Sequence, residues 1–187
     1  MIGILRRMLG RPDRRGILGV AGAWETVGVL HSRLGRLCLG DPFAFPEGWE
    51  AFPIVGETHT VQVMRMDFAG DVRVGALRVL SDMQAVVEEP VGSVVSDCST
   101  LGVAAFPCPL AELEESVRNN PIPGRALECF ADSDFGIAEL PTVPPVQVFH
   151  CSTGFGDGSF PVVSLKSGLD TVGYQVTFIR KDQPYAS

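Results

Sequence analysis

Residues 58–80 read THTVQVMRMDFAGDVRVGALRVL, and this stretch decides the fold class. The ranges 58–68 and 72–80 are both rich in β-branched and other apolar residues, a composition typical of strands. The tripeptide Ala69-Gly70-Asp71 lies between them. It is a hairpin signal, because glycine tolerates the positive φ that such turns need. The stretch therefore predicts two consecutive strands.

The second of these strands is apolar on both faces. Under strict alternation one face carries Val72, Val74, Ala76 and Leu80, and the other carries Leu77 and Val79. A strand of this kind is central in its sheet or covered on both sides. We therefore expect it in the middle of a sheet or between two covering layers.

Further strands and a short helical region flank this hairpin. Strand candidates are the ranges 34–39, 83–95, 143–149, 161–165 and 171–180. The clearest helix is 109–119, where Leu110, Leu113 and Val117 recur at helical spacing. A second, weaker helix follows Gly124. The sequence predicts an α+β fold that is β-rich, with mostly antiparallel sheet or sheets and one or two helices around 109–131.

A chain of 187 residues and 20.0 kDa fits a single domain. We expect one domain over 1–187, with 1–29 a possible N-terminal arm and 183–187 a frayed tail.

Five arginines that precede the mildly apolar run 16–23 give the N-terminal segment the pattern of an export signal. Because that run is short and glycine-rich, we interpret it as a retained segment and keep export as the alternative. No apolar run reaches the length of a membrane helix, so no membrane association is expected.

Charge is distributed unevenly along the chain. Residues 1–40 hold seven Arg against Asp13 and Glu25, a balance of +5, and residues 41–187 carry −12, which together give the net charge of −7. Such a body repels nucleic acid and anionic membranes and attracts a basic protein. The alternative is that the charge serves solubility alone. We expect a basic protein partner and no nucleic acid; the oligomeric state stays open.

The five cysteines form no CxxC pair and are odd in number, and there are only three histidines. Zinc-ligand spacing is therefore missing from the sequence. Free, largely buried cysteines are typical of a cytoplasmic protein, so we expect that location, with no metal and no cofactor.

Three glycines lie within Gly154-Phe155-Gly156-Asp157-Gly158. A phosphate loop would open a helix and supply a basic or hydroxyl residue, whereas here a strand follows. The acidic pattern of a calcium loop is also missing. We interpret the segment as a hairpin turn that Asp157 braces by accepting hydrogen bonds from nearby backbone N–H groups.

No complete catalytic set is visible, and we expect no catalytic residue. His150 and Cys151 are neighbours in a strand, so their side chains point to opposite faces.

The proline-rich loop 42–56 contains four aromatic residues. We expect their side chains to fill the hydrophobic core; the alternative is that they form an exposed recognition patch. They are Phe43, Phe45, Trp49 and Phe52.

Three stretches, in order, resemble a bacterial family known as domain of unknown function 4241. They are Leu37-Cys38-Leu39-Gly40-Asp41-Pro42-Phe43, the strand Asp71-Val72-Arg73-Val74-Gly75-Ala76-Leu77-Arg78-Val79 with Ser81-Asp82, and Gly154-Phe155-Gly156-Asp157-Gly158-Ser159-Phe160-Pro161-Val162. Members of the family often have a Val-Asp-x-Gly-x-Gly-like segment midway along the chain. In the nearest match here, Val95 to Gly102, the aspartate is displaced and one glycine is lost. The resemblance brings no established activity and implies a shared fold.

Some small acidic bacterial domains of this kind look like immunity proteins encoded beside secreted toxins. We therefore expect an immunity protein that neutralises a toxin, for example a nuclease, by occluding its basic active site. The alternative is a small hydrolase or transferase with a pocket near Asp157, His150 or Asp41.

The expected partner-binding segment is 128–139, which gathers acidic residues around two phenylalanines. Its predicted contact residues are Glu128, Phe130, Asp132, Asp134, Phe135 and Glu139, with Glu112, Glu114 and Glu115 of the helix. Aromatic anchors ringed by charge favour tight and fast association. The alternative is that both phenylalanines belong to the core and the carboxylates are only solvated.

Overall fold

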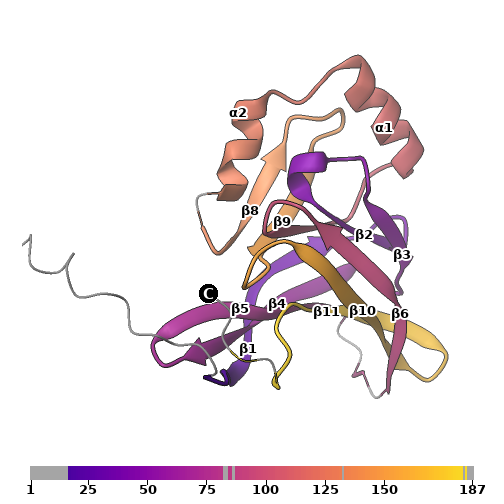
Figure 1. Cartoon of the computed structure of the whole chain (residues 1–187). Coiled ribbons are helices and arrows are strands. Elements are labelled where there is room, and N and C mark those ends of the chain that lie inside the picture. Colours follow the sequence, from indigo (N-terminus) through magenta and orange to yellow (C-terminus); the bar gives the residue numbers. More distant parts are fainter. Residues whose placement is uncertain (1–16, 82–83, 86, 132, 183, 185–187) are drawn as a thin grey trace, which may run out of the picture.

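The computed structural model describes residues 17–81, 84, 85, 87–131, 133–182 and 184. Two antiparallel sheets and a helical layer are stacked in it (Figure 1). The first sheet has six strands in the order β1 (Val20–His31), β4 (Thr58–Phe68), β5 (Asp71–Ser81), β11 (Asp170–Thr177), β10 (Gly158–Ser167) and β6 (Val87–Ser96). The α+β prediction is thus confirmed.

The second sheet has five strands in the order β3 (Glu50–Pro53), β2 (Arg36–Gly40), β7 (Thr100–Ala104), β9 (Val146–Ser152) and β8 (Phe135–Leu140). Its outer face is covered by α1 (Leu110–Asn119) and α2 (Gly124–Leu127), and by the 3-10 helices η2 (Pro42–Ala44) and η3 (Glu128–Ala131). None of the helices among the described residues is long and apolar enough to cross a membrane.

Two hydrophobic cores lie on either side of the second sheet. Leu37 and Leu39 of β2 point into the core between the sheets, and Cys38 points into the core under the helices. Both faces of this sheet are therefore buried, which explains why every residue of β7 is buried and why its sequence does not alternate between apolar and polar residues.

The predicted hairpin of β4 and β5 is present, and β5 lies inside the first sheet as expected. Strict alternation along β5 is wrong, however. Met64 pairs with Ala76 while Arg65 pairs with Val74, so Gly75 is an extra residue in the ladder. This bulge reverses the alternation, and Val74 and Leu77 both reach the same core.

The segment after residue 19 is not part of an arm. Residues from Val20 to His31 pair with β4 along its length, and they form the edge strand of the first sheet. Residues 1–16 lie outside the described part of the chain. Pro184 forms a bridge with Leu18, so the expected frayed tail is held at that point, and its other residues are not described.

The glycine segment 154–158 does not form a hairpin turn. It connects β9 of the second sheet to β10 of the first, because each strand finds its partners in a different sheet. Gly154 has a φ of +76°, and a Cβ there would lie 2.6 Å from Ile179. Asp157 accepts a hydrogen bond from the Ser99 hydroxyl at 2.8 Å, where we expected backbone N–H donors.

Candidate functional site

The site begins at Asp41, the residue that follows β2. One carboxylate oxygen accepts hydrogen bonds from the Phe43 backbone N–H at 2.9 Å and from the Cys98 thiol at 2.8 Å. The other accepts from the Asp97 backbone N–H at 2.9 Å. Asp41 therefore caps η2 and ties it to the turn that leads from the first sheet to the second.

Trp49 fixes the other side of this loop. Its indole N–H donates to the Asp41 carbonyl at 2.8 Å. The ring lies against Gly40 and Gly102, which are paired across β2 and β7. A Cβ on Gly40 would lie 2.5 Å from the indole and one on Gly102 would lie 2.8 Å from it, so only glycines leave room for the ring.

Phe43 is held outside the core by these contacts. Its side chain is 37% exposed, whereas Phe45 and Trp49 of the same loop are buried. Its ring meets Phe130 edge to face, with centroids 5.8 Å apart. Phe43 therefore presents part of its ring to solvent while the ring packs against Phe130.

Three depressions of about 560, 570 and 360 Å³ all include Phe43 in their lining. The first lies toward Thr100 and Ser152, the second toward the end of α1, and the third toward β6. We call this surface the Phe43 face. The acidic side chains that line its depressions are Asp41, Glu47, Asp97, Glu114 and Asp134.

Arg118 is the one basic residue among the described residues that line the Phe43 face. An exposed aromatic ring is thus surrounded by an excess of negative charge. Such a surface can bury the ring against a protein and attract cationic groups around it.

The structure brings part of the predicted interface to this face. Glu114 and Asp134 line its depressions. Phe130 lies beneath it, but at 1% exposure it belongs to the core under the helices and cannot be an exposed anchor. The tight packing of Phe43 and His150 against its ring is the physical reason.

The other predicted contact residues are elsewhere. Phe135 is half-buried against the core between the sheets, with the Arg65 guanidinium 5.1 Å from its ring centre. Asp132 lies outside the described residues. Exposed carboxylates that do not line the Phe43 face are Glu112, Glu115, Glu128 and Glu139.

The residues considered for catalysis are not assembled into a reactive group. Burial and the neighbouring Asp41 raise the pKa of Cys98 to about 12, so its thiol stays protonated at neutral pH. His150 is buried against Phe130, and burial lowers its pKa. Cys151 faces the core on the other side of the second sheet, where burial raises its pKa.

Asp41 and Asp157 hold opposite sides of the turn between β6 and β7, through Cys98 and Ser99. Within the part of the chain that the structure describes, no cluster of three His, Cys, Asp or Glu side chains could hold a metal ion.

Comparisons with protein-family models, curated proteins and solved structures gave no match for this chain. The family resemblance of the three sequence stretches therefore stays a prediction. The structural role of Asp41 and Gly40 accounts for the first stretch, and the crossing between sheets accounts for the third.

Proposed function

We propose that this chain is an acidic cytoplasmic immunity protein that neutralises a bacterial toxin by covering its basic active site with the Phe43 face. The observation that carries the proposal is the exposed ring of Phe43 amid the carboxylates that line its surrounding depressions. The ring supplies apolar burial, and the carboxylates speed encounter with a cationic cleft.

The net charge of −7 supports the same partner chemistry, because it repels nucleic acid and attracts basic protein. The toxin as the partner rests on the sequence-based expectation that small acidic bacterial domains of this kind look like immunity proteins. The cytoplasmic location is supported by Cys38, Cys98, Cys108 and Cys151, which are free thiols.

The test uses the toxin encoded beside this gene, expressed in a susceptible host with and without the chain. We expect the wild-type chain to restore growth and to bind the purified toxin. No rescue by the wild-type chain, or no toxin gene beside it, would contradict the immunity function.

Charge reversal locates the interface. Glu114→Lys with Asp134→Lys should slow association with the toxin about tenfold or more and weaken its dependence on salt, because steering charges are reversed. Glu112→Lys with Glu115→Lys makes the same change in net charge on α1, outside the Phe43 face. Equal association rates for the two double variants would place the interface elsewhere.

A further inference from the structure

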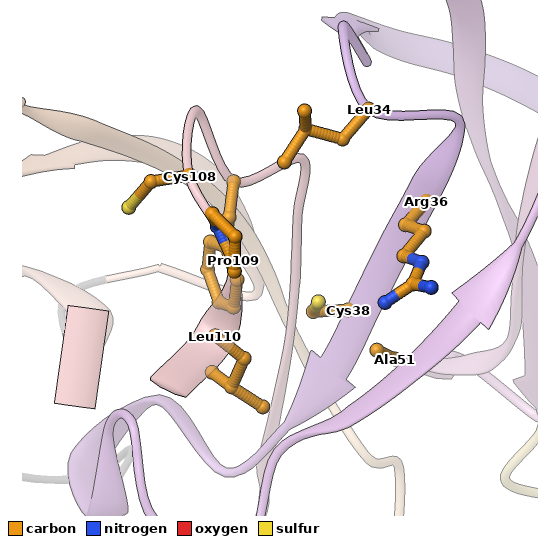
Figure 2. A pocket seen from close by; sticks show the side chains of 8 residues that line it. Leu34, Arg36, Cys38, Ala51, Cys108, Pro109 and Leu110 are labelled. Carbon is orange, nitrogen blue, oxygen red and sulfur yellow. The ribbon is translucent and has the colours of Figure 1, made fainter. Parts of the chain in front are cut away.

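A separate cavity lies at the opposite ends of β2 and α1 from the Phe43 face (Figure 2). It measures about 300 Å³, at the lower end of the range typical of small-molecule sites. Its floor includes Cys38 and Ala51, which are paired across β2 and β3. The segment that leads into α1 supplies Phe106, and the first residue of α1 is Leu110, which also lines the cavity.

The lining of this cavity is apolar and uncharged apart from one residue. Cys38 and Phe106 are 3% and 4% exposed, so they form a buried inner wall. Leu34, at 46% exposure, stands at the rim. Burial raises the pKa of Cys38 to about 12, and burial followed by the charge of Glu112 raises that of Cys108. Neither thiol therefore contributes a negative charge at neutral pH.

Among the described residues that line the cavity, Arg36 alone is charged, and it is exposed to solvent. Figure 2 shows its side chain extending along β2 toward Cys38 and Ala51. The described part of the chain supplies it with no ion pair. This solvent-exposed guanidinium beside an apolar cavity therefore has no anionic partner among the described residues and is accessible to an anion from solution.

We infer that this cavity binds a small monocarboxylate with an apolar tail, of the medium-chain fatty acid class. The tail lies between Phe106, Leu110 and Leu34, and the carboxylate pairs with Arg36. The planar guanidinium matches a carboxylate, with two parallel hydrogen bonds. A phosphate group carries more negative charge than a carboxylate, and the single arginine would not offset its repulsion by a negatively charged protein. A carboxylate therefore fits this cavity better than a phosphate.

The test titrates octanoate and octanamide, which share a tail and differ in charge, into the full chain. Binding is followed by calorimetry and by the fluorescence of Trp49, whose ring centre lies 5.6 Å from that of Phe106. We expect saturable binding of octanoate at one site and binding of octanamide weaker by about tenfold or more, because charge-assisted bonds to arginine are the strong ones. Equal affinities would overturn the role of Arg36.

Three variants complete the test. Arg36→Gln should weaken octanoate binding to the level of octanamide, and Ala51→Leu, which fills the cavity from an exposed strand position, should abolish binding of both. Arg33→Gln removes the same charge from a position that does not line the cavity and should bind like the wild type.

Lack of saturable octanoate binding to the folded wild-type chain overturns the inference. So does octanoate binding that survives Ala51→Leu, since the ligand would then sit elsewhere. If octanoate does not bind but Ala51→Leu abolishes toxin binding, the cavity belongs to the protein interface instead, and the proposed function stands without this ligand.

Discussion

The exposed ring of Phe43 rests edge to face on the buried ring of Phe130, with ring planes at 74°. The two residues are far apart in sequence, yet Phe43 forms the apolar centre of the Phe43 face and Phe130 packs beneath it. Their different exposure means that binding and stability can be separated by substitution.

Phe43→Ala should leave the fold in place and remove the apolar centre of the Phe43 face. We expect toxin affinity to fall by about 2 kcal/mol or more, as for an aromatic hot spot. Phe130→Ala should instead cost about 3–5 kcal/mol of unfolding free energy, because it empties a packed core position. Urea denaturation and binding kinetics on both variants check this. A larger stability loss for Phe43→Ala than for Phe130→Ala would contradict it.

Gly102→Ala should strain the packing of Trp49. The new methyl group would lie 2.8 Å from the indole, so the ring must shift, at a cost of about 1–3 kcal/mol. Gly124→Ala is the matched control, since a Cβ there meets nothing within 4 Å. Chemical denaturation followed by tryptophan fluorescence measures both. Equal stability of the two variants would show that the loop tolerates a displaced ring.

Asp41→Asn should make Cys98 more reactive. The carboxylate hydrogen-bonds the thiol and, after burial, contributes to its raised pKa, so removing the charge lowers that pKa and increases the thiolate fraction. Alkylation by iodoacetamide, resolved by site with mass spectrometry, should be faster at Cys98 in the variant. Cys108 is the internal control, because Glu112 and not Asp41 acts on its pKa. Unchanged Cys98 alkylation would argue against the hydrogen bond.

Stability should decrease in alkaline solution. Burial raises the pKa of Cys38 from 9.0 to about 12, and the pKa values of Cys151 and Tyr174 are raised as well. The folded state therefore holds these protons more tightly. The stabilisation is complete below the pKa of the unfolded thiol and is lost as pH rises toward the folded value.

Urea denaturation between about pH 8 and about pH 10 should show this decrease, because the unfolded thiols lose their protons first. Cys38→Ala removes one contributor and should make the decrease shallower. An equally steep decrease in that variant would exclude Cys38 as a source.

The sequence predicted the parts of the fold that local patterns encode. The hairpin of β4 and β5 and the helix α1 follow from alternation, a glycine turn and helical spacing. The strands β1 and β7 were missed for opposite reasons. β1 is an edge strand with little buried surface, and β7 is buried on both faces, so neither alternates clearly.

The candidate site was less predictable because it depends on contacts across the two sheets. Sequence spacing placed Phe130 and Phe135 in one acidic segment, yet they face opposite cores. The proline-rich loop suggested buried aromatics, which holds for Phe45 and Trp49 but not for Phe43. The loop that carries Phe43 is held by contacts of Asp41 with Asp97 and Cys98, in the turn between β6 and β7, far away in the chain.

The position of β11 between β5 and β10 also determines how the chain can fold during synthesis. A ribosome that has not yet released residues 170–177 holds one half-sheet of β1, β4 and β5 and another of β6 and β10, each with an open edge. The late strand joins the two halves. Until it emerges, the nascent protein presents unpaired backbone at two sheet edges that can pair with other chains, which exposes it to aggregation.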